Sequence, residues 1–569
     1  MAYDLVVKGG TLIDGTGAPP RLGDVAIEEG VIVAVGEVEG EAHRTLDATG
    51  HAVTPGFVDI HTHYDGQATW DPALAPSCYH GVTTVVMGNC GVGFAPVRPD
   101  HHDFLIGLME GVEDIPGAAL HEGIQWEWES FPEYLDALGR REFAMDVATQ
   151  VPHGAVRAYV MGDRGANNEP ATPEDIAQMA ALVKDGIAAG ALGFSTSRTI
   201  AHRAITGEPV PGTFAAEDEL FGIGRALGEL GKGIFEVAGA GVAGEDIAAP
   251  KAELDWMRRL SKEIQRPVTF AMVQVDSAPN LWQELLDLSA AAAREGAEIF
   301  PQVAGRPFGM LVGHQTDIHP FADRPSYSVL LELPFEERVR RMREPQVRRR
   351  ILAEGDPAAP SFVVAQLGRV FPMGDPPNYE PAWEDSVEGL AQASGADPVE
   401  LLYDRMLARD GKELFLVPLL NYSEGNADPI RAMMQHPRAV LGLGDGGAHC
   451  GMICDASIQT YMLSHWVRDR TRGEKVSVEF AIRRMTKDTA DLYGLTDRGV
   501  IEIGKKGDLA IIDLEKIRLR LPEMLHDLPA GGRRLMQRAD GYRAIVVSGE
   551  VTLEHDELTG THPGRLVRL

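Results

Sequence analysis

Two histidines separated by a single residue follow an apolar run near the start of the chain. His61 and His63 come directly after Phe57-Val58-Asp59-Ile60. Residues two apart in an extended strand point to the same side, so both imidazoles would face one way. Two neutral imidazoles at the end of a buried strand can hold a divalent metal ion, which could activate water for hydrolysis. Such pairs also arise by chance, so the rest of the sequence must show whether this pair belongs to a metal site.

Two further apolar runs end in residues of ligating type. Val85-Val86-Met87-Gly88-Asn89 leads to Cys90, which could offer a thiolate to a metal or simply fill the core. Val440-Leu441-Gly442-Leu443-Gly444 leads to Asp445, a carboxylate that needs a charged partner if it is buried. Asp445 could ligate the metal and take a proton from the attacking water; the alternative is a turn residue before two glycines. His449 could lie near the metal or the substrate, or could serve as a cap or surface residue.

Short apolar segments in the middle of the chain predict the strands that carry these residues. Each is followed by a polar segment of helical period, such as the one after Thr172, where a Thr cap, a Pro and early acids mark a helix start. Repeated strand–helix units predict a parallel sheet, and about eight of them predict a closed (β/α)8 barrel. A doubly wound open sheet is the alternative, but no Gly-x-Gly-x-x-Gly follows the first strand. The predicted strands cover residues 57–60, 83–87, 143–151, 190–195, 233–237, 267–273, 414–420 and 440–444.

The two ends of the chain share a sequence pattern that differs from the strand–helix pattern of the middle. Residues 4–36 and 506–551 hold short strands separated by Gly and Asp turns, which is typical of a small β-sheet unit. We therefore expect residues 1–54 and 499–569 to build one β-sandwich around a hydrolase barrel that spans residues 55–498. The segment at about 301–400 is predicted to be an insertion or a lid over the barrel mouth.

Length, charge and cysteine content limit the class of protein. At 569 residues, the chain is long enough for one large catalytic domain and a smaller one. The net charge of −31 argues against nucleic acid and against anionic membrane surfaces as partners. The four cysteines are too few for a disulfide framework, and neither an export signal nor an apolar run of ~18 residues is visible. We expect a cytoplasmic enzyme with a small-molecule amide substrate; a homo-oligomer is compatible with the sequence.

Taken together, these segments resemble the amidohydrolase superfamily and, within it, the N-acyl-D-amino-acid deacylase (D-aminoacylase) family. The element Gly88-Asn89-Cys90-Gly91 separates this family from hydantoinases and dihydroorotases. The resemblance implies a (β/α)8 barrel, a β-sandwich from both termini, and zinc held by His61, His63, Cys90 and Asp445. It also implies that metal-activated water attacks an N-acyl-D-amino acid while Asp445 passes a proton to the leaving amine. The similar stretches are residues 5–15, 55–63, 81–91, 190–196, 444–446 and 559–565.

The chain departs from that family at several site positions. Glu236 stands where the family has a metal-binding His after strand five, and a carboxylate can replace imidazole on zinc. The strand-six His is also missing, and only Met272 or Gln274 stands nearby, so we expect one Zn²⁺ with Glu236 as a substitute ligand, or the loss of a second ion. Phe300 is interpreted as replacing a Tyr near the substrate. Arg306, on a Gly-flanked loop, could bind a substrate carboxylate or be a surface arginine.

The sequence thus predicts a zinc-dependent hydrolase of non-peptide C–N bonds with one or two ions per chain. The expected substrates are N-acyl-D-amino acids or similar small amides. A hydantoinase-like hydrolase of cyclic amides is one alternative, and a catalytically silent scaffold with the same fold is another. Metal content separates these, because a scaffold need not bind zinc tightly.

Overall fold

The main body of the molecule is built on a closed barrel of parallel strands. The computed structural model describes residues 2–355, 360–453 and 455–569. Asp445 N donates to His61 O at 3.0 Å and His63 N donates to Gly446 O at 2.7 Å, and these bonds join the eighth strand to the first. The predicted (β/α)8 barrel is therefore confirmed, and the open sheet is excluded. The barrel strands are β6 (Phe57–Asp59), β7 (Val82–Met87), β8 (Asp146–Thr149) with its continuation β9 (Val151–Pro152), β10 (Gly193–Ser197), β11 (Ile234–Ala238), β12 (Val268–Ala271), β13 (Ile299–Val303) and β17 (Val440–Leu441).

Helices connect the strands and bury one face each against the barrel. The helix predicted after Thr172 is α6: Asp175 N donates to Thr172 Oγ1, and Thr172 N donates back to the Asp175 carboxylate, which completes a capping box.

Among the described residues, no helix is both long and apolar enough to cross a membrane. The helices on the barrel are α1 (His102–Glu113), α2 (Gly117–Gly123), α3 (Phe131–Gly139), α4 (His153–Met161), α5 (Asp163–Ala166), α6 (Pro173–Ala188), α7 (Glu217–Leu230), α8 (Ala249–Ile264), α9 (Leu281–Arg294), α16 (Asp428–Gln435), α17 (Ile458–Tyr461), α18 (Val478–Met485) and α19 (Lys487–Leu492).

The seventh barrel strand differs from the one predicted. Residues 414–420 were expected in the barrel, but β16 (Phe415–Leu420) pairs antiparallel with β14 (Phe308–Val312) and β15 (Phe371–Pro372) outside it. Instead, β13 lies between β12 and β17. Both segments are short and apolar, so only their pairing partners distinguish them. The insertion expected to start at 301 therefore starts after β13, whose last residues belong to the barrel.

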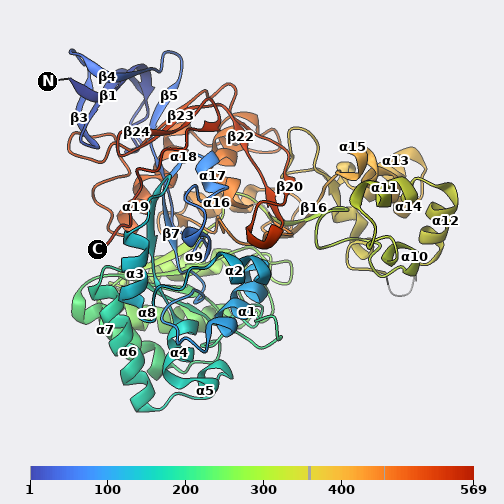
Figure 1. The fold of residues 1–569 in the computed structure, drawn as a ribbon, viewed down its shortest axis with the longest axis horizontal. Coiled ribbons are helices and arrows are strands. Elements are labelled where there is room, and N and C mark those ends of the chain that lie inside the picture. The colour runs from blue at the N-terminus through green and yellow to red at the C-terminus, as the bar shows by residue number, and fades with distance from the viewer. Residues whose placement is uncertain (1, 356–359, 454) are drawn as a thin grey trace.

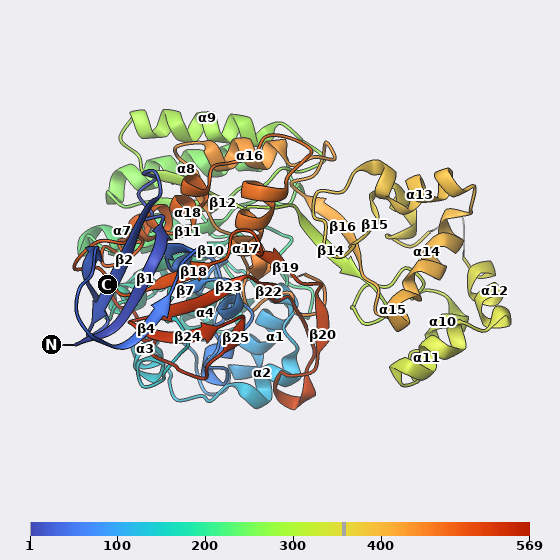
Figure 2. The ribbon, with the colours of Figure 1, turned by 90° about the horizontal axis from the view of Figure 1, so that it is seen from above.

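Residues 308–420 form an insertion lobe that projects away from the barrel (Figures 1 and 2). The lobe has an apolar core of its own, which includes Phe321, Tyr327, Tyr403 and Phe415. Such a core lets the lobe hold its shape on a narrow connection to the barrel. Its helices are α10 (Pro325–Ser328), α11 (Phe335–Met342), α12 (Pro345–Ala353), α13 (Val387–Ser394), α14 (Pro398–Met406) and α15 (Ala408–Gly411).

Strands from both ends of the chain form one sheet, as predicted. The N-terminal β5 (Ala52–Pro55) pairs antiparallel with the C-terminal β18 (Leu509–Ile512). From β5 the chain passes through Gly56 straight into β6, and a Cβ at Gly56 would lie 2.2 Å from the Thr83 side chain, so only glycine allows this approach. The sheet thereby anchors the strand that carries the two histidines. Its other strands are β1 (Tyr3–Leu12), β2 (Arg21–Glu28), β3 (Val31–Gly36), β4 (Ala42–Asp47), β23 (Tyr542–Val547), β24 (Glu550–Glu554) and β25 (Glu557–Leu558).

Candidate metal centre

Three buried side chains from the first two barrel strands converge at the carboxyl ends of those strands. His61, His63 and Cys90 each place one ligand atom within 4.8 Å of the other two. His61 Nε2 lies 3.4 Å from Cys90 Sγ. Burial lowers the pKa of His61 to about 4, so this imidazole is neutral at pH 7 and its lone pair is available to a metal.

Asp445 lies beside these three residues. Its Oδ1 is 3.4 Å from His61 Nε2 and 3.6 Å from His63 Nε2. Burial would raise the pKa of Asp445, but hydrogen bonding to His63 and the charges of the histidines hold it well below its ordinary value. Asp445 is thus an ionised carboxylate at neutral pH, which suits both metal ligation and proton acceptance.

Each histidine is oriented by a buried polar partner on its other side. His61 Nδ1 lies 2.9 Å from Gln302 Oε1, on β13, and His63 Nδ1 lies 3.4 Å from Glu113 Oε1, at the end of α1. Burial alone would lower the pKa of His63, but Glu113 and Asp445 raise it to about 9, so a metal bound here would displace a proton from this ring. Such partners fix the tautomer and the ring plane of a metal-binding histidine. Sequence reasoning missed Gln302 and Glu113, because neither directly follows a recognised strand end beside another ligand.

The Gly-Asn-Cys-Gly element works as a structural clamp. Asn89 Nδ2 donates to the carbonyl of Thr62, between the two histidines, at 3.1 Å, and to that of Val86 at 2.9 Å. Cys90 has a φ of 55° in the left-handed region, which costs a non-glycine residue about 1 kcal/mol or more. A Cβ at Gly91 would lie 2.7 Å from Ser197 N, so the next residue must be glycine for the turn to pack. The clamp therefore fixes Cys90 against the histidine strand.

Glu236 is buried inside the barrel next to Cys90. Its Oε2 accepts a hydrogen bond from the Cys90 backbone N–H at 3.1 Å. Its Oε1 is buried and has no hydrogen-bond partner among the described residues. Burial raises the pKa of Glu236 to about 8, and the charges of Asp445 and Glu113 act in the same direction. A cation here would offset that cost, because an uncompensated buried carboxylate is expensive.

Neither Met272 nor Gln274, the residues near the end of strand six, reaches the site. Ala271 pairs in register with Gln302, which contacts His61, so Ala271 occupies the site-facing position. By strand alternation, Met272 points to the other face. It lines an apolar recess with Met257 of α8, which Ala271 also borders. Gln274 bonds to loop groups instead: its Nε2 donates to Pro279 O at 3.1 Å. Met272 and Gln274, the residues near the position of the missing histidine, thus do not replace it as ligands in this structure.

Phe300 is also placed differently from its interpretation. It lies under the Arg438 guanidinium, 4.0 Å from the ring centroid, in an apolar cluster with Val440 and Tyr493. Gln302, two residues nearer the carboxyl end of the same strand, is the residue at the level of His61. Alternate residues of a strand fill successive layers of the barrel interior. Phe300 therefore lies one layer below the level of His61, where the interpretation had placed it.

The two residues expected to bind substrate lie in different settings. Arg306 is buried, with its guanidinium 2.6 Å from Asp455 and 3.9 Å from the Tyr379 ring centroid, so it is not a surface arginine. His449 remains partly exposed, and its Nε2 lies 3.9 Å from Glu113 Oε2. His449 thus stands at the edge of the metal group, while the charge of Arg306 is balanced by Asp455.

His202 is a further residue near the centre that sequence reasoning missed. It belongs to the loop after β10, and its Nδ1 lies 3.0 Å from Ser197 Oγ. Burial lowers the pKa of His202 to about 4, and the charges of the metal-centre residues act on it. A neutral imidazole therefore lies beside the site. Sequence reasoning could not identify His202, because it follows its strand only after an irregular stretch.

Comparison with known proteins assigns the chain to a family. The sequence model of the amidohydrolase family matches residues 44–553 of this chain. This chain belongs to the amidohydrolase family. It is similar to the D-aminoacylase of Alcaligenes xylosoxydans xylosoxydans, with 28% identity over 99% of this chain and 97% of that protein. The N-acyl-D-aspartate deacylase of the same organism is 26% identical over 99% of this chain and 95% of its own length.

Solved structures of other amidohydrolases share the fold. A crystal structure of D-aminoacylase matches all of this chain and all of its own with a TM-score of 0.65 and 25% identity. The N-acyl-D-glutamate deacylase of Bordetella bronchiseptica, complexed with zinc and a phosphonate inhibitor, matches over 100% of both chains with a TM-score of 0.66 and 21% identity, a likeness that shows the fold. The barrel with a terminal β-sandwich and the resemblance to the deacylases are thus confirmed.

The donor set of this amidohydrolase fits a zinc ion. Imidazole, thiolate and carboxylate are the groups that bind zinc in proteins, and His61, His63, Cys90 and Asp445 supply them from neighbouring strand ends. Glu236 Oε1 is buried there without a hydrogen-bond partner among the described residues. A zinc ion bound at this place would supply Lewis-acid chemistry and water activation.

Proposed function

We propose that this amidohydrolase binds Zn²⁺ and cleaves the amide bond of N-acyl-D-amino acids or of similar small amides. The observation that carries the proposal is the convergence of His61, His63 and Cys90, with Asp445 against both imidazoles. The similarity to D-aminoacylase and to N-acyl-D-aspartate deacylase along nearly the whole chain supports the substrate class.

The residues of the chain divide the work at the proposed site. Asp445, ionised and 3.4 Å from His61 Nε2, accepts a proton from the attacking water and returns it to the leaving amine. Gln302 and Glu113 hold the two imidazoles in place. An ionised carboxylate placed to move a proton is what amide hydrolysis needs, because the leaving nitrogen must be protonated. A protein that only binds the amide would not need such a group.

The same geometry favours one metal ion over two. The strands on one side of the site supply two histidines, a cysteine and an aspartate, whereas strands five and six supply only Glu236 at the site-facing positions described. We therefore propose about one tightly held zinc per chain, with Glu236 as its additional carboxylate ligand.

A substrate panel combined with metal analysis tests the proposal. Purified protein would be analysed for zinc by mass spectrometry and assayed against matched N-acetyl-D- and N-acetyl-L-amino acids, with hydantoins as the cyclic comparison. We expect zinc in the protein, release of free D-amino acid, and loss of activity on chelation. Hydrolysis of hydantoins alone would favour the cyclic-amide alternative. Absence of both zinc and hydrolysis would identify a silent scaffold.

A further inference from the structure

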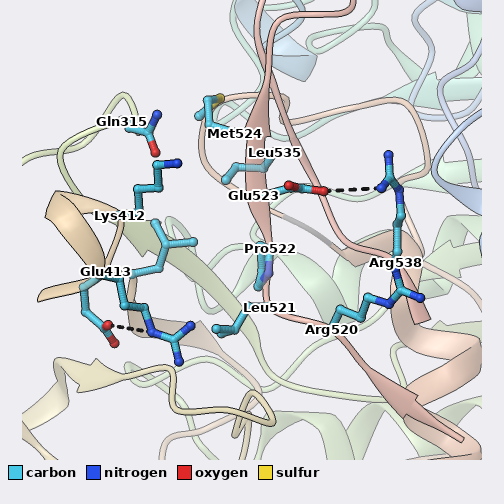
Figure 3. A pocket seen from close by; sticks show the side chains of 12 residues that line it. Gln315, Lys412, Glu413, Arg520, Leu521, Pro522, Glu523, Met524, Leu535 and Arg538 are labelled. Carbon is cyan, nitrogen blue, oxygen red and sulfur yellow. Dashed lines mark ion pairs between the residues drawn. The ribbon is translucent and has the colours of Figure 1, made fainter. Parts of the chain in front are cut away.

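A second, separate cavity lies at the root of the insertion lobe. It has a volume of about 550 Å³ and lies between the lobe and the strands β20 (Glu523–Leu525) and β21 (Arg534–Met536) (Figure 3). We call it the root groove. Arg409 and Lys412 line it from the lobe, while Arg520 and Arg538 line it from the C-terminal segment. The residues of the metal centre are not part of this lining.

The charge of the root groove is opposite to that of the protein. Four basic residues and only two acidic ones, Glu413 and Glu523, line it, in a chain whose net charge is −31. An acidic protein repels small anions at long range, so a local excess of cations is what allows one to bind. The cations in the groove therefore favour an anion locally, in an otherwise unfavourable field.

Two of the cations have binding capacity left over. Arg409 pairs with Glu413 at 3.2 Å, and Arg520 pairs with Asp540 at 2.6 Å. In the described part of the chain, however, no carboxylate pairs with Lys412. Arg538 pairs loosely with Glu523, at 3.6 Å, and its buried Nε has no hydrogen-bond partner among the described residues.

Figure 3 shows Lys412 and Arg538 on opposite sides of the groove, with apolar side chains between them. Leu521, Pro522 and Leu535 lie in this middle part. The volume falls within the range of about 300–1,000 Å³ that small-molecule sites occupy. Cations at the rim and an apolar centre together match a ligand that has one anionic group and one apolar chain.

We propose that the root groove binds a small organic anion with an apolar chain, such as a medium-chain carboxylate. Lys412, on the lobe side, contacts the anionic group, and the chain packs on Leu521 and Leu535 toward the side of Arg538. This site is independent of the hydrolysis proposed above. It adjoins the metal centre, because Leu535 N donates to Cys450 O at 2.6 Å, and Cys450 follows His449.

Calorimetric titration with decanoate tests the proposal. The zinc-loaded wild type should bind decanoate, whereas acetate, which lacks the chain, and decylammonium, which reverses the charge, should bind far more weakly. Lys412→Glu should weaken decanoate binding at least about tenfold, because it replaces an attraction by a repulsion at the anionic group. Arg538→Glu should weaken it less, because Arg538 lies on the opposite side of the groove. Arg350→Glu is the matched control, since it makes the same charge change on the exposed surface of the lobe.

The outcomes separate this proposal from the reaction at the metal centre. Lys412 is exposed, so Lys412→Glu should fold normally and keep its hydrolytic activity on a short N-acetyl substrate. Decanoate held by the zinc instead of the groove would bind Lys412→Glu as tightly as the wild type, and that result overturns the proposal. Equal binding of decylammonium, or equal weakening by Arg350→Glu, overturns it as well.

Discussion

The two sides of the metal centre are equipped very differently. Where strands one, two and eight end, two histidines, Cys90 and Asp445 converge, and each imidazole has a buried polar partner behind it. Where strands five and six end, Glu236 is buried with an unpaired oxygen, and Ala271 occupies the site-facing position of strand six. One side is a complete, oriented donor set, and the other is a single carboxylate.

This difference indicates that metal number and hydrolytic competence are separable in the barrel. The proposed base, Asp445, and the two imidazoles all belong to the complete side, so one ion held there would be sufficient for the proposed reaction. The sparse side would then adjust how tightly that ion is held. Four substitutions test this division.

Asp445→Asn should have the largest effect, because it removes the base but keeps the shape of the side chain. We expect hydrolysis to fall by about a thousandfold, within the range that a positioned general base contributes. The measurement is kcat/KM on the best N-acetyl-D-amino acid, with thermal unfolding as the check on folding. If Asp445→Asn keeps more than a tenth of the activity, another residue is the base.

Glu236→Gln should weaken zinc binding strongly if the sparse side contributes a ligand. Glutamine can still accept the hydrogen bond from the Cys90 backbone N–H, so the substitution removes charge rather than shape. We expect zinc affinity to fall by about a hundredfold, measured by competition with a chelator. The control is Glu253→Gln, a buried glutamate that pairs with Arg198 instead. Unchanged zinc affinity in Glu236→Gln would remove this residue from the ligand set.

Gln302→Leu should have a smaller effect, because Gln302 acts through His61 rather than on the metal. Loss of the 2.9 Å contact to His61 Nδ1 frees the ring to rotate and to change tautomer. We expect zinc affinity to fall about tenfold, with partial recovery in Gln302→Glu, which restores an acceptor. Failure of Gln302→Glu to bind zinc better than Gln302→Leu would show that packing alone matters there.

Most of the fold could be predicted from the sequence, because strand runs and turns repeat with a clear alternation. The exception was strand seven, where Pro301 and Gln302 interrupt the apolar pattern of β13 while residues 414–420 read as a cleaner strand. Only pairing distinguishes the two, and pairing is not visible in local sequence. The joining of the two termini into one sheet agreed with the prediction. That pairing could be inferred because both ends of the chain show the same pattern of short strands and turns.

The grouping of side chains was predictable where a residue of ligating type directly follows a strand, as for His61, Cys90 and Asp445. It was not predictable for Gln302, which lies inside a strand, or for Glu113, which ends a helix. Met272 shows a second limit. Which face of a strand a residue points to depends on register, and a shift of one residue reverses it.

Ala271→His tests the comparison most directly, because it adds an imidazole to the sparse side. Ala271 pairs in register with Gln302, so a histidine there would point toward the metal centre. We expect the zinc content to rise from about one to about two ions per chain, since the new imidazole and Glu236 could share a second ion. Met272→His is the matched control: it lies one residue away but faces the recess beside α8, so it should destabilise the fold without adding zinc. Equal zinc content in wild type and Ala271→His would show that the sparse side cannot hold an ion even with a second ligand. The limit to one metal would then come from the backbone positions of strands five and six rather than from their side chains.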